Sequence, residues 1–334
     1  MPTYFDLEVR PPAESWRLLR RLRANPPVPP ASSVLRRHTF QAALEQAEQQ
    51  FRAAASVSYE SRALNLYYGL SQAGRAIAAG ASTLTGNDWT LSGHGLRCSN
   101  LPDVAKDVAT LSVRPHSGAQ TSFQRLSQAL QSPIPTIAEL YSVWPNLIET
   151  TMNAPLGDVA YAPMFLTMGS RFPSDGVIHV EANVALPLGI MSMTISDRPS
   201  LPDFLDRYPG LVGWVTHRPD GHAVDWPPQQ SLSLQWPLGA TTSTDHWLRS
   251  RVTRYRSHDL VVPTIGSLTQ PVHPLMAWWI VLYVLSMATR YQPAEWTIAV
   301  DVNRSAQATA IEFVLDCALS SVPELLVEAV EFVQ

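Results

Sequence analysis

Residues 274–288 form the most hydrophobic stretch of the chain and read Pro-Leu-Met-Ala-Trp-Trp-Ile-Val-Leu-Tyr-Val-Leu-Ser-Met-Ala. With about 15 residues, the stretch is shorter than the roughly 20 that a helix needs to cross a bilayer. Its apolar side chains would lie on nearly all sides of a helix. We therefore predict a buried helix at the centre of a helical bundle, and no membrane span.

Helical patterns on both sides of this segment supply the rest of a bundle. Apolar residues at three- and four-residue steps predict core-facing helices over 37–55 and 59–79, and the short connection between them favours an antiparallel pair. Residues 12–24 predict a short helix with an arginine-rich face, followed by an extended proline linker at 26–30. The other expected helices are residues 121–131, 136–151, 202–207, 293–300, 306–320 and 323–332.

The middle third of the chain has a different pattern, with short apolar segments separated by proline and glycine turns. This spacing favours an antiparallel sheet over βαβ units. Pro187 and Pro237 must then lie at strand ends or on edge strands, because proline cannot donate to a ladder. The expected strands are residues 108–113, 161–168, 177–185, 189–195, 211–216, 231–236 and 247–255.

These patterns predict an α+β fold, in which N- and C-terminal helices form a bundle and enclose an inserted, mostly antiparallel β-rich region. We expect the chain to divide into four parts. They are an arginine-rich helix with its proline linker (1–36), a helical part (37–152), the β-rich region (153–270) and the helices that complete the bundle (271–334).

Charge and cysteine content exclude several classes of protein. The formal net charge of −4 gives no general attraction to nucleic acid or to an anionic membrane. Cys98 and Cys317 lie far apart, the histidines are scattered, and no Gly-rich phosphate loop is present, so we expect no metal and no cofactor. The first residues have neither a basic region nor a cleavage site of the kind found in export signals. We therefore expect a cytoplasmic location.

Two stretches resemble the YaaC-like family of bacterial proteins. The first is Leu66-Tyr-Tyr-Gly69 followed by Gly93-His94-Gly95-Leu96-Arg97, and the second is the Leu-Ser-Met-Ala-Thr-Arg-Tyr run that ends at Tyr291, with Trp296 nearby. The two stretches keep the order that they have in the family, so the resemblance spans about residues 40–330. It implies an architecture, and it names no reaction.

A second likeness is to the HEPN helical domains, whose helices often carry runs similar to Ala63-Leu-Asn-Leu-Tyr-Tyr-Gly-Leu-Ser-Gln-Ala73. Many HEPN domains are metal-independent ribonucleases that use an arginine and a histidine with four to six residues between them, while others only bind or scaffold. Arg251 and His258 have a six-residue gap, but they lie in a segment with a strand pattern.

His94 and Arg290 are the candidate catalytic residues, and Tyr68, His94, Arg97, Arg290 and Tyr291 are the candidate ligand-binding residues. The pKa of a histidine lies near neutrality, and an arginine offers a fork that fits phosphate or carboxylate. Arg290 ends the apolar helix, where a charge must reach solvent or pair. We predict that it meets the His94 loop in one polar pocket. The alternative is that Arg290 caps helix carbonyls and that His94 hydrogen-bonds within a loop.

Arg251, Arg254 and Arg256 form a second basic group. If residues 247–255 form a strand that continues past Tyr255, Arg254 and Arg256 share one face, and this basic strip would suit an RNA backbone. The alternative is an ordinary solvated surface.

Two functional classes remain open. The first is a non-catalytic binding or scaffolding protein that takes a nucleotide or RNA near His94, Arg97 and Arg290. The second is a HEPN-like ribonuclease of a toxin or phage-defence system, so whether the chain is an enzyme stays open. The expected partners are another protein of the same pathway, a nucleotide or RNA, and a second copy of the chain in a homo-oligomer.

Overall fold

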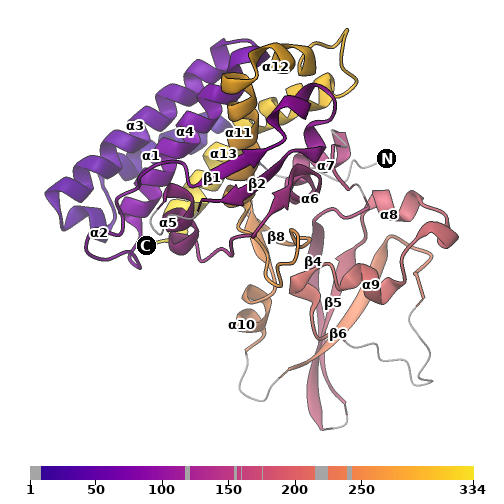
Figure 1. Cartoon of the computed structure of the whole chain (residues 1–334). Helices are drawn as coiled ribbons and strands as arrows, with labels where there is room; N and C mark the ends of the chain where they lie inside the picture. Colours follow the sequence, from indigo (N-terminus) through magenta and orange to yellow (C-terminus); the bar gives the residue numbers. More distant parts are fainter. Residues whose placement is uncertain are drawn as a thin grey trace.

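Helix α11 (Pro274–Tyr291) lies at the centre of the bundle, and every residue from Pro274 to Ala288 is buried. The computed structural model describes residues 9–116, 121–153, 156–158, 160–174, 176–214, 225–238 and 243–334. Around α11 pack α4 (Tyr59–Gly80), α12 (Pro293–Ala299) and α13 (Ala308–Phe332) (Figure 1). The described residues include no helix whose length and hydropathy would let it span a membrane.

The outer layer of the bundle consists of α1 (Pro12–Ala24) and α3 (Val34–Ser56). Helix α1 packs on α13 and α3, and α3 runs along α4 as the expected helix pair. The residues expected to form an extended linker instead include a single helical turn, α2 (Val28–Ala31). Prolines are tolerated in a first turn, because its backbone N–H groups have no partner inside the helix.

The close approach of α3 and α4 depends on glycine. A Cβ added at Gly69 would lie 2.6 Å from Cδ2 of Phe51, whose side chain is buried. We therefore expect Gly69→Ala to lower the free energy of unfolding by about 1–3 kcal/mol, although alanine is the better helix former. Gly80→Ala, on the same helix, is the control, because its Cβ would meet nothing nearer than 3.5 Å. Urea unfolding measures both, and equal midpoints would contradict the close-packing argument.

A small antiparallel sheet lies against α11, in the order β1 (Leu96–Ser99), β2 (Ser112–Pro115) and β3 (Ala138–Glu139). The hydroxyl of Tyr283 on α11 donates to the carbonyl of Leu96 over 2.6 Å and ties β1 to the central helix. The elements between and after these strands are η1 (Leu101–Ala105), η2 (Val108–Thr110), α5 (Ser122–Ala129), α6 (Leu140–Val143), η3 (Trp144–Asn146) and α7 (Ile148–Asn153).

A five-stranded antiparallel sheet forms the other end of the molecule, in the order β6-β5-β4-β8-β7 (Figure 1). Its strands are β4 (Met164–Ser174), β5 (Val177–Ala185), β6 (Ser231–Leu238), β7 (Thr253–Tyr255) and β8 (His258–Val261). Pro237 lies near the end of the edge strand β6, and Pro187 precedes a helix, as proline chemistry requires. The elements that accompany the sheet are α8 (Leu188–Ser192), η4 (Ile195–Asp197), α9 (Leu201–Leu205), η5 (Pro209–Leu211) and α10 (Thr244–Arg249).

The α+β prediction is confirmed, with helices beside a mostly antiparallel β-rich region. The sheet has its own hydrophobic cluster, while Tyr255, Leu260 and Val262 join the cluster of the bundle. The division of the chain into four parts stays a prediction.

Several element predictions were wrong for local reasons. The strand expected at 189–195 is largely helix α8, which follows Pro187. Of the strand expected at 211–216, Leu211 ends η5 and residues 212–214 form no strand. Residues 215 and 216 lie outside the described residues. The segment 108–113 begins as η2, and 136–151 is broken around Pro145. Conversely, α13 continues through Pro323, where a break was expected. The helix is buried on both sides of the proline, so its packing against the bundle outweighs the lost hydrogen bond.

Candidate functional site

His94 lies in the loop between α4 and β1 and contacts the aromatic side of the bundle. Its Nδ1 is 3.1 Å from the hydroxyl of Tyr67, and its ring centroid is 5.5 Å from that of Tyr67 and 6.1 Å from that of Tyr283. Gly93 and Gly95 flank it at φ values of 59° and 87°, a region that glycine enters without strain. The two glycines thus allow the sharp turn that presents the imidazole to α4 and α11.

Arg290 reaches the same surface from the C-terminal end of α11. Its Nη1 donates to the hydroxyl of Tyr68 over 3.3 Å, and its guanidinium lies 5.1 Å from the ring centroid of Tyr291. Among the described contacts, it donates to no carbonyl of its own helix. Because Tyr68 follows Tyr67 on α4, the arginine and the histidine are joined through two adjacent tyrosines.

Burial and the charges around His94 favour the neutral form of its ring. Burial lowers the pKa of His94 first, and the positive charges of Arg290 and Arg75 lower it further. Burial also raises the pKa of Tyr67, so its hydroxyl keeps its proton. At neutral pH the pair is therefore an uncharged imidazole beside an uncharged phenol. Sequence reasoning missed Arg75, although it follows Tyr68 by seven residues on α4 and so lies on the same helix face.

Arg97 lies next to this group on β1. Its side chain is exposed and donates to Nε2 of His116 over 3.3 Å. In the β1–β2 register it faces Arg114, another exposed arginine that sequence reasoning missed.

Burial, and after it the neighbouring Cys98 and Tyr291, raise the pKa of Tyr283 to about 12, while Arg97 opposes the shift.

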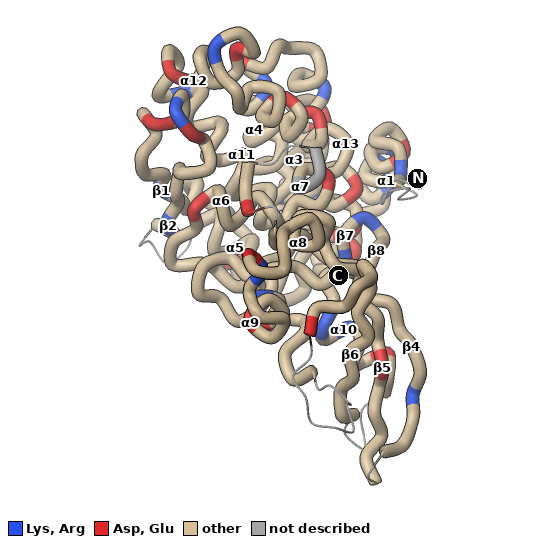
Figure 2. The backbone as a smooth tube through the Cα atoms, turned by 90° about the vertical axis from the view of Figure 1, so that its right-hand side faces the viewer, with Lys and Arg blue, Asp and Glu red and all other residues tan. Residues whose placement is uncertain are grey.

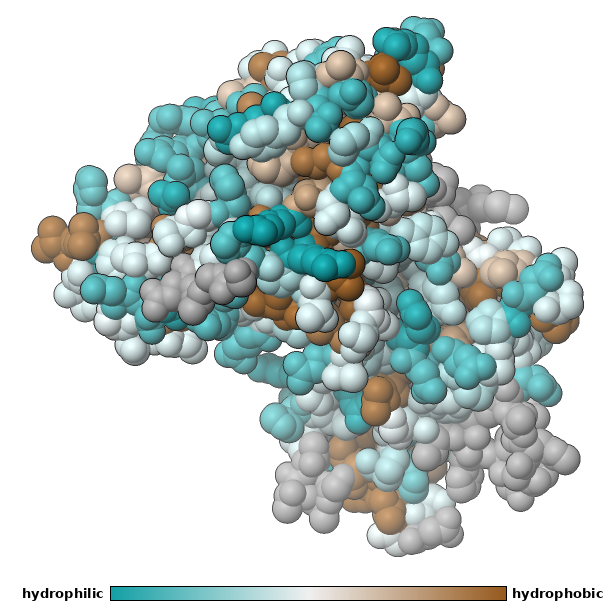
Figure 3. All heavy atoms as spheres, in the orientation of Figure 1, coloured by the Kyte–Doolittle hydropathy of each residue, from teal (hydrophilic) through white to brown (hydrophobic). Residues whose placement is uncertain are grey.

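Four exposed arginines thus lie on α4, β1, β2 and the end of α11: Arg75, Arg97, Arg114 and Arg290. None of them forms an ion pair with a carboxylate in the part of the chain that the structure describes. Figure 2 marks basic positions on β1 and β2, and strongly hydrophilic side chains lie over these strands in Figure 3. We call these four arginines with Tyr68, His94 and Tyr291 the arginine–tyrosine surface.

The family model for YaaC-like proteins matches residues 12–330. The chain belongs to the YaaC-like family. The resemblance seen in the sequence is therefore confirmed, and its quoted segments lie within the match. Neither the curated proteins nor the solved structures contain a match to the chain.

The basic strip expected near residue 254 is not formed in this YaaC-like chain. The segment 247–255 is divided between α10 and β7, so it is not one strand. Arg256 lies beyond β7 in a two-residue turn, with φ values of 48° at Arg256 and 67° at Ser257. Its side chain is buried, whereas Arg254 is exposed. The two arginines therefore do not share a solvent-facing side.

Arg256 belongs instead to a buried charge network between the sheet and the bundle. Its guanidinium pairs with Glu149 of α7 at 2.7 Å and with Glu324 of α13 at 2.9 Å. The backbone N–H groups of Arg256 and Ser257 both donate to Glu328 of α13. Burial alone would lower the pKa of Arg256, but the carboxylates of Glu149 and Glu324 outweigh burial and raise the pKa. Figure 2 shows basic positions beside acidic ones between β7 and α7.

The Arg251–His258 pair suggested by the HEPN likeness has other partners in the structure. Arg251 donates to the carbonyls of Gly210 and Val212, and its guanidinium lies 5.6 Å from the ring centroid of Trp247. His258 donates from Nδ1 to the carbonyl of Arg256 over 2.8 Å. Each side chain thus holds a local backbone segment, and no described hydrogen bond joins the two. The comparisons do not address the HEPN likeness itself.

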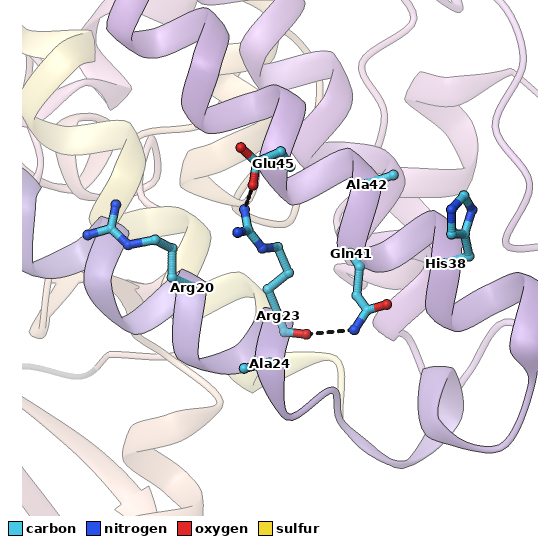
Figure 4. Close-up of a pocket in the computed structure, with 7 residues that line it drawn as sticks. All are labelled: Arg20, Arg23, Ala24, His38, Gln41, Ala42 and Glu45. Atoms are coloured by element: carbon cyan, nitrogen blue, oxygen red, sulfur yellow. Dashed lines mark hydrogen bonds and ion pairs between the residues drawn. The ribbon is translucent and has the colours of Figure 1, made fainter.

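Apart from the arginine–tyrosine surface, a pocket of about 440 Å³ lies between α1 and α3 (Figure 4). Two of its arginines are neutralised, because Arg23 pairs with Glu45 and Arg20 pairs with Glu48. The amide of Gln41 donates to the carbonyl of Arg23 over 2.9 Å and joins the two helices. These contacts explain Arg20 and Arg23 of the arginine-rich face as part of the packing of α1 on α3.

Proposed function

We propose that this protein binds a nucleotide or RNA at the arginine–tyrosine surface without transforming it. The observation that carries the proposal is the set of four exposed arginines with no described ion pair, in a chain whose net charge is −4. Guanidinium groups fit phosphate oxygens, and the half-buried Tyr68 and exposed Tyr291 offer rings on which bases stack. A binding role of this kind fits a scaffold that acts with another protein of its pathway or as a homo-oligomer.

His94 would contribute a hydrogen bond to the ligand. Its Nδ1 is engaged by Tyr67, which leaves Nε2 on the other side of the ring. Because burial, and after it the neighbouring Arg290 and Arg75, lower the pKa of His94, the ring is uncharged and can donate or accept a hydrogen bond.

A metal-independent ribonuclease, of a toxin or of phage defence, is the second candidate. An uncharged histidine beside an arginine is the arrangement that a general base and a phosphate clamp need. Incubation with total RNA separates the two candidates. A binding protein leaves the RNA intact, whereas a nuclease cleaves it and loses that activity in His94→Ala and Arg290→Ala.

Arg290→Gln is expected to weaken the binding of a fluorescein-labelled RNA about 10-fold to 100-fold, because one charge-assisted contact contributes roughly 1.5–3 kcal/mol. Fluorescence anisotropy gives the dissociation constants. The matched control is Arg249→Gln on α10, which removes an exposed arginine beside the five-stranded sheet and should leave the affinity unchanged. An equal loss of affinity in both variants would show that RNA responds only to the net charge of the protein and not to this surface. If the protein bound neither RNA nor nucleotides, the proposal would be overturned.

A further inference from the structure

The β1–β2 pair sets two arginines side by side on its exposed face. Arg97 and Arg114 are directly opposite each other in the antiparallel register, which places their Cα atoms about 4.5–5.5 Å apart. Like charges at such positions destabilise a strand pair. Neither guanidinium has an ion pair among the described residues, so no salt bridge described there offsets this repulsion.

His116 extends the pair towards the His94 loop. Arginine can only donate, so Nε2 of His116 accepts from Arg97 and the ring carries its proton on Nδ1. The backbone N–H of His116 donates to the carbonyl of Gly95 over 2.8 Å. The backbone of His116 is therefore held beside Gly95, the residue that follows His94.

The nearest carboxylate in the register does not neutralise the two arginines. Glu139 of β3 faces Ser112, which lies two residues before Arg114 on β2 and so belongs to the same side of the sheet. The side chain of Glu139 is exposed. It forms no described ion pair with Arg114. A phosphate placed over Arg97 and Arg114 would supply the missing negative charge and could accept from both forks at once.

We propose that Arg97, Arg114 and His116 form a second phosphate subsite, so that the ligand is a single-stranded RNA rather than a mononucleotide. The inference rests on the proposed function. Arg75 and Arg290 would hold one phosphate beside the stacking rings of Tyr68 and Tyr291, and the strand pair would hold a neighbouring phosphate. Only a chain of nucleotides places bases and several backbone phosphates along such a surface.

The test compares a labelled ten-nucleotide uridine RNA with uridine monophosphate and ATP as competitors, all measured by fluorescence anisotropy. Arg114→Gln is expected to weaken RNA binding about tenfold or more and to change monophosphate binding less than twofold, since one charge-assisted contact is lost. Arg290→Gln should weaken both ligands. Arg114→Lys keeps the charge and should retain most of the RNA affinity. Monophosphate binding within twofold of the wild type shows that Arg114→Gln is folded. Arg249→Gln on α10 is again the control and should leave the affinity for each ligand unchanged.

The outcomes separate this inference from the proposed function. If Arg114→Gln leaves RNA affinity within twofold of the wild type, or weakens the monophosphate equally, the second subsite is wrong and the first stands. The same holds if the monophosphate or ATP binds as tightly as RNA. If none of the ligands binds, both proposals fall together.

Discussion

Replacing Arg256 with methionine is expected to lower the free energy of unfolding by about 3–5 kcal/mol, because it removes the cation from a buried charge network. The side chain of Arg256 is only 4% exposed and that of Glu324 only 2%. Without the arginine, Glu149 and Glu324 are left with their negative charges and without their cation. Urea unfolding, followed by circular dichroism, measures the loss.

Two controls show whether burial causes the effect. Arg254→Gln removes an arginine that is 64% exposed and lies 3.7 Å from Glu328, so its loss should stay below about 1 kcal/mol. In the combined variant Glu149→Gln, Arg256→Met, Glu324→Gln, no charge of the triad remains, and more than half of the lost stability should return. An Arg256→Met variant as stable as Arg254→Gln would show that the network contributes little.

RNA affinity is expected to fall about 50-fold between 50 and 200 mM salt if all four arginines of the arginine–tyrosine surface contact phosphates. Each contact with a single strand releases counterions and adds about −0.7 to the slope of log affinity against log salt, so four contacts give about −2.8. Anisotropy titrations at four salt concentrations measure this slope.

The salt dependence of single variants then shows how many arginines contact phosphates. Arg114→Gln should reduce the slope by about 0.7, so the same change in salt would weaken binding only about 20-fold. Arg249→Gln should leave the slope unaltered, because that residue lies on α10. A wild-type slope near zero would mean that the ligand is held without phosphate contacts.

The parts of the fold that depend on local pattern could be predicted from the sequence. The apolar run became α11, and the alternating segment at 177–185 became β5 with the same bounds. The sequence also pointed to His94 and Arg290 as neighbours, and the structure joins them through Tyr67 and Tyr68.

The parts that depend on distant contacts could not be predicted. A turn with two positive φ values usually requires residues such as Asn-Gly, so Arg256-Ser257 looked like a continuing strand. Its conformation is held by Glu149, Glu324 and Glu328, which lie far away in the sequence. Arg114 could be recognised as a candidate binding residue only from the register that places it opposite Arg97. The sequence of one short segment does not show with which residues of another strand it pairs.

The tyrosine that holds His94 also faces a tryptophan of the central helix. The rings of Tyr67 and Trp279 meet edge to face, with centroids 5.7 Å apart, and Trp279 is fully buried. The emission of a buried indole depends on its immediate surroundings, and these include the phenol that contacts the histidine. The protein therefore carries a natural fluorophore, shielded from water, one ring away from the loop where we place the ligand.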